Sequence, residues 1–226
     1  MKIQLIRNAT MKITLAGKTI LTDPVLSLKH GIESFAGIEK NPTVDLPFPV
    51  ADIIEDVDMV LVSHLHQDHF DKAAQNMLSR DIQICCRPDD ENTLKDHGFM
   101  QVISVDDHIV VDGINLTRTP GSHADNKKWQ DILGSVSGFI LKADTEPVIY
   151  WAGDTILTDE VKDTIRNTKP DIIITHSCGA VLDDSGPIVM DAQQTIEVCK
   201  TAPEAIVVAV HLEALDHGTV TRDDVR

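Results

Sequence analysis

Apolar and polar residues alternate at the start of the chain, a pattern typical of half-buried antiparallel strands. The alternation covers residues 2–7, 11–17 and 18–24, and Ala16-Gly17 is suited to a turn between the last two. The sequence therefore predicts an N-terminal β-meander. Residues 30–50 contain three of the ten prolines and show no clean period, so we expect a long excursion there.

After this excursion, short apolar runs alternate with helical patterns. The run at 59–63, MVLVS, is wholly apolar and suits a strand buried on both faces. Further strands are expected at 82–86, 100–105, 108–120 with a turn at Asp112-Gly113, 135–143, 147–154, 171–177 and 204–214. Helices are expected at 71–80, 88–98, 158–169 and 190–202. Residues 100–154 are expected to extend a mostly antiparallel sheet. We interpret 1–226 as one α/β domain of two mixed sheets with helices outside.

Composition agrees with an ordinary soluble globular protein. The chain has 226 residues, 42% hydrophobic and 25% charged. It contains no run of about 20 apolar residues, and its start turns polar too early for a secretory signal, so we expect a cytoplasmic protein without a membrane partner. The four cysteines lack zinc-knuckle spacing and are interpreted as reduced thiols.

The charge balance narrows the class of partner. Thirty-six acidic residues against 20 basic ones give a formal net charge of -16. A surface of that sign repels phosphate backbones, which argues against a nucleic-acid binder and favours small-molecule substrates. The oligomeric state stays open, a homo-oligomer included.

One histidine-rich segment follows the buried run at 59–63 directly. In VSHLHQDHFD, His64 and His66 are two residues apart, so on an extended segment both project to the same side. Asp68 and His69 follow as the chain turns toward the next helix. Imidazole and carboxylate are common ligands of divalent metals, and a solvated histidine-rich loop is the alternative. We favour a metal site.

Further ligands are expected at other strand ends, where sites in layered α/β folds gather. His123 follows a strand across a Pro-Gly break, Asp154 follows a glycine after VIYWA, and His211 ends AIVVAVH. Taken singly, these residues have other interpretations: a turn histidine, a helix-capping aspartate and a core histidine. Together with the cluster they complete two coordination spheres.

This arrangement resembles the metallo-β-lactamase superfamily. The motifs that carry the resemblance are HLHQDH at 64–69, GSH at 121–123, GD at 153–154 and His211, which together span most of the chain. The resemblance implies an αββα sandwich of two mixed β-sheets with helices on the outer faces.

Within the superfamily, ILTDP, HSCGA, MDAQQ and HLEALDHGTVTRDD look like the branch of the ascorbate-6-phosphate lactonases. Relatives in that branch usually continue beyond the point where this chain ends in DDVR. The zinc β-lactamases have no histidine at the place of His69, and some use cysteine at the place of Asp154, which argues against antibiotic hydrolysis.

The resemblance also implies a set of metal ligands. His64, His66 and His123 look like ligands of one ion, Asp68, His69 and His211 like ligands of the other, and Asp154 like the bridge. Two divalent ions, zinc, manganese or iron, would share a bridging hydroxide that attacks the substrate. Asp68 would also act in catalysis by orienting this hydroxide. Asp23 could accept a hydrogen bond from a ligand N–H, or simply start a turn with Pro24.

Other side chains are candidates for binding substrate. His176 ends a buried strand, His217 follows His211 by six residues, and His30 opens the long excursion. Each could hydrogen-bond a substrate or protonate a leaving group, or could be structural. Lys128 and Trp129 could bind an anionic group, although a solvated loop is the simpler interpretation for Lys128.

Three functions are compatible with these observations. The first is a dinuclear metal-dependent hydrolase, lactonase-like or esterase-like, of a small ester, lactone or phosphorylated sugar-acid substrate. The second is a metal-dependent phosphodiesterase or nuclease, against which the net charge argues. The third is a non-hydrolytic metal-binding redox protein.

Overall fold

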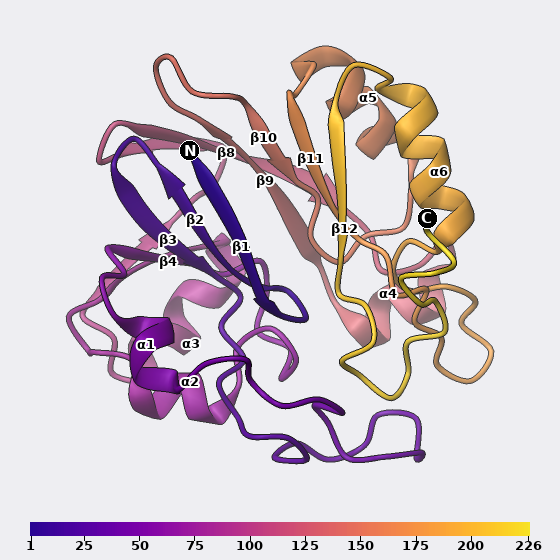
Figure 1. Cartoon of the computed structure of the whole chain (residues 1–226), viewed down its shortest axis with the longest axis horizontal. Coiled ribbons are helices and arrows are strands. Elements are labelled where there is room, and N and C mark those ends of the chain that lie inside the picture. The colour runs from indigo at the N-terminus through magenta and orange to yellow at the C-terminus, as the bar shows by residue number, and fades with distance from the viewer.

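The first sheet contains the N-terminal strands. The computed structural model describes residues 1–226 (Figure 1). Six strands lie side by side in chain order: β1 (Lys2–Arg7), β2 (Thr10–Leu15), β3 (Lys18–Thr22), β4 (Met59–Leu61), β5 (Gln83–Cys86) and β6 (Gln101–Ser104). The pairs from β1 to β3 are antiparallel, whereas those from β3 to β6 are parallel. The expected N-terminal meander is present, and the sheet is mixed.

The second sheet is formed by the rest of the chain. Its six strands are β7 (His108–Val111), β8 (Ile114–Gly121), β9 (Val136–Lys142), β10 (Ile149–Trp151), β11 (Ile172–His176) and β12 (Ile206–Val210). They lie in the order β12-β11-β10-β9-β8-β7. The pairs from β7 to β10 are antiparallel, and β10, β11 and β12 run parallel.

Helices cover the outer face of each sheet. The short 3₁₀ helix η1 (Pro88–Asp90) leads into α3, and helix α4 (Lys127–Leu133) follows β8. The first sheet is covered by α1 (Val50–Ile54), α2 (Lys72–Met77) and α3 (Glu91–Asp96), and the second by α5 (Asp159–Thr168) and α6 (Ala192–Thr201). The expected αββα sandwich is confirmed.

Three apolar layers hold this arrangement together. Eighteen buried residues lie between the sheets, including Leu61 and Met11 from the first and Phe139 and Trp151 from the second. Smaller clusters join each sheet to its helices. In β4, Met59 and Leu61 belong to the central layer and Val60 to the helix side, because successive side chains in a strand point to opposite faces. This explains why the run is wholly apolar.

Two expectations need correction. Strand 101–104 was expected in the antiparallel part, but it pairs in parallel with β5 because α3 returns the chain along the same sheet. Helix α4 was not expected. Asn126 begins it by accepting a hydrogen bond from the Trp129 backbone N–H, and Trp129 is buried. The pattern is short, and the two lysines at its start obscured it.

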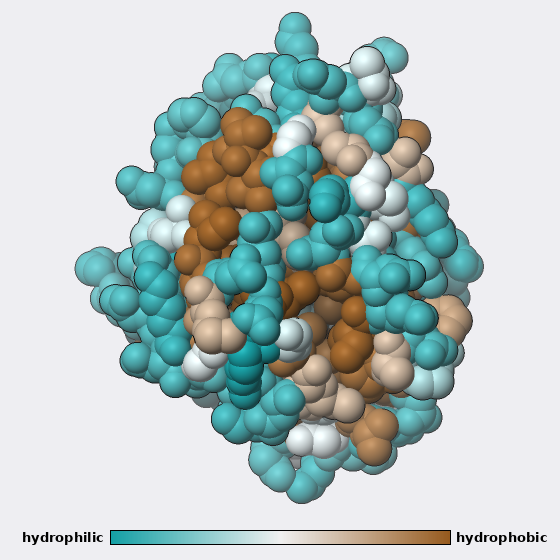
Figure 2. All heavy atoms as spheres, turned by 90° about the vertical axis from the view of Figure 1, so that its left-hand side faces the viewer, coloured by the Kyte–Doolittle hydropathy of each residue, from teal (hydrophilic) through white to brown (hydrophobic).

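One face of the molecule carries both hydrophobic and hydrophilic side chains. Figure 2 shows a face on which hydrophobic residues gather in the middle and hydrophilic ones form the rim. No helix of the structure combines the length and the apolar character needed to cross a lipid bilayer.

Candidate metal centre

The candidate ligands lie in loops that leave the strands at one edge of the two sheets. Residues 64–69 follow β4 in the first sheet. His123, Asp154 and His211 follow β8, β10 and β12 in the second sheet. Because parallel neighbours end at the same edge, β3 also brings Asp23 beside the loop after β4.

His64, His66 and His123 form one group. Their ligand atoms lie within 4.8 Å of one another, and the His64 and His123 side chains are buried. His64 Nε2 lies 2.9 Å from His66 Nδ1. The loop after β4 and the loop after β8 therefore meet at one point, although His123 is 57 residues beyond His66 in sequence.

Hydrogen bonds on the far side of each ring determine which nitrogen is bare. His66 Nε2 faces the Leu133 carbonyl at 3.0 Å, and His123 Nδ1 faces the Ile188 carbonyl at 3.1 Å. A carbonyl only accepts, so each of these nitrogens carries the proton. The Ser63 hydroxyl donates to Asp23 and so accepts from His64 Nδ1 at 3.0 Å.

Three bare nitrogens consequently face one another: His64 Nε2, His66 Nδ1 and His123 Nε2. His123 Nε2 is buried and has no hydrogen-bond partner. Burial, with a smaller contribution from neighbouring imidazoles, lowers the pKa of His123 to about 4 and that of His64 well below its ordinary value. Neutral imidazoles whose lone pairs converge suit a divalent cation, which would supply the missing partner.

A second group combines carboxylates with imidazoles. His69 Nε2 lies 3.1 Å from Asp154 Oδ2 and 3.2 Å from His211 Nε2. Asp68 Oδ2 lies 3.6 Å from His69 Nε2 and 3.5 Å from His211 Nε2. Asp23 accepts from His69 Nδ1 at 2.7 Å, which leaves Nε2 directed at the group.

Charge distinguishes this group from the first. Burial alone would lower the pKa of His69, but the carboxylates of Asp154, Asp68 and Asp23 outweigh it and raise the pKa to about 10. Although burial opposes the change, carboxylates also raise the pKa of His211 well above its ordinary value. Burial would raise the pKa of Asp154, yet the imidazoles hold it well below normal. The buried carboxylates of this group need a positive charge nearby, which protons on the histidines or a bound cation can supply.

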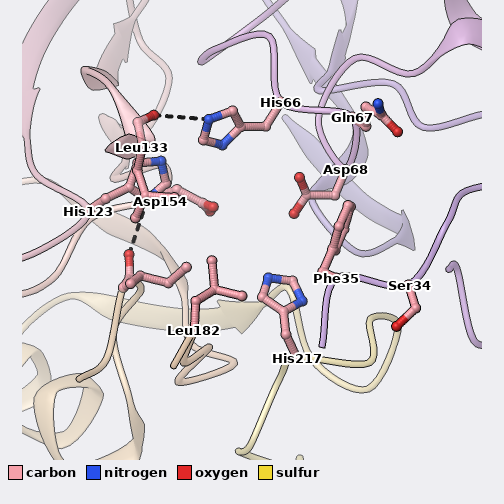
Figure 3. A pocket seen from close by; sticks show the side chains of 11 residues that line it. Ser34, Phe35, His66, Gln67, Asp68, His123, Leu133, Asp154, Leu182 and His217 are labelled. Carbon is pink, nitrogen blue, oxygen red and sulfur yellow. Dashed lines mark hydrogen bonds between the residues drawn. The ribbon is translucent and has the colours of Figure 1, made fainter. Parts of the chain in front are cut away.

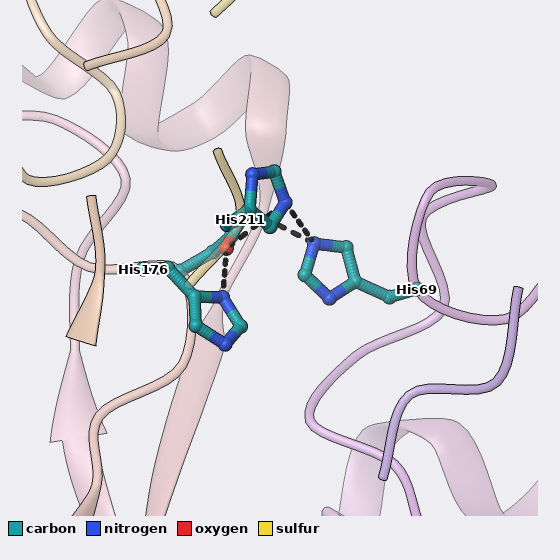
Figure 4. Close-up of side chains that lie close together, drawn as sticks. His69, His176 and His211 are labelled. Atoms are coloured by element: carbon teal, nitrogen blue, oxygen red, sulfur yellow. Dashed lines mark hydrogen bonds and ion pairs between the residues drawn. The ribbon is translucent and has the colours of Figure 1, made fainter. Parts of the chain in front are cut away.

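His176 lies beside this second group (Figure 4), but both of its ring nitrogens are occupied. Trp151 Nε1–H donates to His176 Nε2 at 2.9 Å, and an indole N–H can only donate. The ring proton is therefore on Nδ1 and is donated to Asp154 Oδ1 at 2.6 Å. His176 is fully buried, so it orients Asp154 and does not face the cavity.

Backbone features position the loops. Gly153 has φ +69°, and a Cβ there would lie 2.6 Å from the Ser137 carbonyl oxygen, so only glycine fits before Asp154. The Asn8 side-chain amide donates to the Asp68 backbone carbonyl at 2.8 Å, and the Asn8 backbone carbonyl accepts from the His211 N–H at 3.1 Å. Asn8 thereby links the ligand loops of both sheets.

Sequence reasoning missed several of these supporting residues. Asn8 sits in an ordinary turn between β1 and β2, and Cys178 lies 3.2 Å from His211 Nδ1. Leu133 contributes its carbonyl to His66 from the unexpected helix α4. Their partners lie far along the chain, so no local pattern identifies them.

A cavity of about 430 Å³ opens next to both groups (Figure 3). Its walls combine ligand candidates with other side chains: Ser34, Phe35, His66, Gln67, Asp68, His123, Leu133, Asp154, Leu182, Ile188 and His217. The His217 ring makes no hydrogen bond to the chain and packs edge-on against Phe35, with 5.1 Å between ring centroids. No lysine or arginine lines the cavity.

Three other substrate-binding candidates lie outside this cavity. His30 is 43% exposed and pairs with Glu39 at 2.6 Å. Lys128 and Trp129 both contact Asp184, the lysine through Nζ at 2.8 Å and the tryptophan through Nε1 at 3.1 Å. Lys128 and Trp129 are therefore engaged with a carboxylate of the chain itself.

Comparisons with known proteins show the family of the chain. The sequence profile of the β-lactamase superfamily domain matches residues 18–212. The UPF0173 protein YddR of Bacillus subtilis is 35% identical over 231 residues, with 100% of this chain and 91% of that protein covered. A UPF0173 metal-dependent hydrolase of Methanosphaera stadtmanae is 25% identical, with 77% of this chain and 70% of that protein covered.

Solved structures show the same similarity. An isothiocyanate hydrolase from Delia radicum gut bacteria superposes with a TM-score of 0.92 at 35% identity, covering 100% of this chain and 90% of that one. A protein from Veillonella parvula described as a possible metal-dependent hydrolase gives 0.95 at 31% identity, covering 99% and 90%.

Proposed function

Because the chain belongs to the β-lactamase superfamily and to its metal-dependent hydrolases, we propose that it binds two divalent ions and hydrolyses a small, uncharged substrate. One observation carries the proposal. The outer nitrogens of His64, His66 and His123 are all engaged, and their inner nitrogens converge without a proton between them.

The second group supports a second ion. The carboxylates of Asp68 and Asp154 lie within 3.6 Å of the Nε2 atoms of His69 and His211. Divalent ions held in these two groups would supply Lewis acidity and would lower the pKa of a water molecule in the cavity. Zinc, manganese and iron all suit nitrogen and oxygen ligands. We propose Asp154 as the ligand shared by both sites.

The chain's own residues have distinct parts in this proposal. Asp68 lines the cavity, where its carboxylate accepts a hydrogen bond from the attacking water and orients it. His217 offers unpaired ring nitrogens to a substrate heteroatom from another part of the wall. Apolar walls exclude other water molecules.

The walls of the cavity favour an uncharged substrate. Phe35, Leu133, Leu182 and Ile188 are apolar, and Asp68 and Asp154 are anionic. The proposed ions would lie at the bond that reacts, so a phosphate elsewhere on the substrate would need a cationic side chain, and the wall has no lysine or arginine. A small ester or lactone therefore fits better than a phosphorylated sugar acid, and the ascorbate-6-phosphate lactonase branch receives no support from the cavity.

An isothiocyanate is a second candidate within this class. The chain is 35% identical over its whole length to a hydrolase that acts on isothiocyanates. An isothiocyanate is uncharged, has an electrophilic carbon between nitrogen and sulfur, and carries an organic group that apolar walls can bind. We rank this substrate class above esters and lactones.

The proposal is tested with the purified protein. We expect elemental analysis after reconstitution to find about two ions per chain. The loaded protein should consume benzyl isothiocyanate, phenyl acetate or δ-valerolactone at least about tenfold faster than a 6-phosphorylated sugar lactone, because only the last needs a cationic partner. His64→Ala should abolish turnover.

Other outcomes would contradict the proposal. Protein that retains only trace metal after reconstitution would exclude the metal centre. Preferential cleavage of single-stranded RNA would favour the nuclease alternative. Iron-only protein that consumes oxygen without hydrolysing any probe would favour the redox alternative.

A further inference from the structure

One wall of the cavity belongs to a loop with few ties to the rest of the protein. Ile32 and Asn41 pair through an isolated antiparallel bridge, and the residues between them form the loop. Its tip is exposed, and Ile38 has 78% of its surface in solvent. Apolar packing therefore contributes little to holding the tip. Ser34 and Phe35, at the near end of the loop, line the cavity.

The carboxylate of Asp216 holds this loop through several hydrogen bonds. Its Oδ1 accepts from the Phe35 N–H at 3.0 Å and from the Asn41 side chain at 2.8 Å. Its Oδ2 accepts from the Ser34 hydroxyl and from the Ala36 N–H at 3.1 Å. Two longer contacts come from the N–H groups of Ile38 and Glu39. No other hydrogen bond joins residues 33–40 to the chain beyond residues 30–42.

Asp216 is also next in sequence to His217, which lines the same cavity. The His217 ring packs edge-on against Phe35, and Figure 3 shows the two rings side by side next to Asp68. Asp216 thus connects the two parts of this wall, one from the long excursion and one from the segment after β12. The ligand groups bond to other partners and do not use Asp216.

We propose that Asp216 is a positioning residue that holds Phe35 against His217 and so shapes the substrate side of the cavity. Substrate affinity depends on this wall, whereas metal binding does not. The proposal rests on the proposed function only in its second part, the effect on substrate.

The charge state of Asp216 fits this role. Burial alone would raise the pKa of Asp216, but the hydrogen bonds from Ser34, Asn41 and the Phe35 and Ala36 backbone hold it well below its ordinary value. The group is therefore an anion at neutral pH. Asp216→Asn keeps the size of the side chain but replaces one acceptor oxygen with an NH₂ group that would face the donors of the loop.

Hydrogen exchange tests the first part without any substrate. In Asp216→Asn, we expect amides of residues 33–40 to exchange about tenfold faster than in wild type, since the loop loses its main tie. Asp224→Asn is the matched control, because Asp224 accepts from the Thr221 N–H and hydroxyl in an exposed turn that does not line the cavity. Unchanged exchange in Asp216→Asn would overturn the proposal.

Kinetics with benzyl isothiocyanate test the second part. Asp216→Asn and Phe35→Ala should each raise KM about tenfold while kcat changes less than about twofold, because each removes wall contacts and not ligands. The double variant should be no worse than the more severe single variant, since both act through Phe35. Additive effects on KM, or loss of metal in Asp216→Asn, would contradict the proposal.

The two proposals fail in different ways. If wild type holds no metal and consumes no probe, the proposed function is wrong, and hydrogen exchange still decides whether Asp216 holds the loop. If wild type is active but Asp216→Asn keeps the wild-type KM, only the positioning role is wrong.

Discussion

At the scale of single residues, the candidate centre depends on which ring nitrogen of each histidine is already engaged. His64, His66, His69 and His123 each use one nitrogen on an outer partner and leave the other directed inward. His176 uses both, through Trp151 and Asp154. From its position at a strand end, the sequence suggested that His176 contacts substrate. Its bonds instead make it a support for Asp154.

This difference predicts two graded effects on metal content. Asp154→Ala should lose at least one of the two proposed ions, because Asp154 is our proposed ligand shared by both sites. His176→Ala should lower metal affinity about tenfold or more, since it frees the Asp154 carboxylate to rotate. His108→Ala, at an exposed histidine, is the control. Metal content equal to wild type in both site variants would contradict these roles.

Replacing Gly153 should disturb the site through the backbone. In Gly153→Ala, the added Cβ would meet the Ser137 carbonyl at 2.6 Å, so Asp154 must shift. We expect a loss of about 1–3 kcal/mol in the free energy of unfolding, together with reduced metal content. Gly17→Ala has a similar φ of +74° but nothing within 4 Å of the Cβ. We expect Gly17→Ala to lose less stability in urea unfolding and to retain metal binding. The comparison separates the effect of the steric clash at position 153 from that of the backbone strain that both variants share.

The two ligand groups should respond differently to pH. The carboxylates raise the pKa of His69 to about 10 from 6.5, so metal must displace its proton at neutral pH. Affinity at that site should rise up to about tenfold per pH unit between pH 6 and 8. Burial lowers the pKa of His123 to about 4, so its nitrogen is already bare and the first site should vary little.

Zinc titrations at several pH values would measure both sites, and equal slopes would contradict the assignment. The stability of the metal-free protein provides a second check on the pKa of His69. Because folding raises this pKa, protonated His69 stabilises the fold fully below pH 6.5, and this contribution is lost as the pH rises toward 10.

At the scale of elements, the short helix α4 contacts one candidate ligand, His66, although the helix lies outside the 64–69 motif. Its last residue, Leu133, accepts the His66 Nε2 proton through its carbonyl and also lines the cavity. The helix begins at Asn126, whose side chain accepts from the Trp129 N–H at 3.1 Å. We therefore expect a change at the start of α4 to affect the orientation of His66.

If the Asn126 cap is removed, we expect a local effect on the metal site. Asn126→Ala should cost about 1 kcal/mol of stability and should weaken metal binding, because the Leu133 carbonyl becomes less well positioned. Thr158→Ala removes the equivalent cap of α5, which contributes no site residue. Similar destabilisation in both, with weaker metal binding in Asn126→Ala alone, is the expected result. Equal metal affinity would show that α4 is not coupled to His66.

At the scale of the whole molecule, the centre joins two sheets that pack through an apolar layer. Residues 64–69 belong to the first sheet, and His123, Asp154 and His211 to the second. A cation bound by both sets would oppose separation of the sheets. Without it, carboxylates and protonated histidines stay buried together at the edge.

Metal removal should therefore lower global stability. A ligand at a thousandfold excess over its Kd contributes about 4 kcal/mol, so EDTA should lower the melting temperature by many degrees and added ions should restore it. Asp154→Ala should show a smaller difference between the two states. A melting temperature that EDTA leaves unchanged would contradict metal binding across the sheets.

Local pattern determined much of this protein. The alternation in residues 2–22 and the apolar runs of β4 and β11 predicted strands, because side-chain burial on one or both faces is written directly into the order of residues. The same logic singled out residues 64–69, Asp154 and His211 as chemistry at strand ends. It placed residues 101–104 among antiparallel strands, whereas they pair in parallel with β5, since strand partners depend on how α3 returns the chain.

The tertiary structure alone decided the details of the site. Contacts across the chain determine which nitrogen of each histidine is bare, and His176 donates to Asp154. They also engage Lys128 and Trp129 with Asp184 and place Phe35 beside His217. Apart from Ser63, which adjoins His64, the partners in these contacts lie between 22 and 182 residues away in sequence. A local pattern reports which face of an element is buried, whereas hydrogen-bond partners are selected only when distant loops pack together.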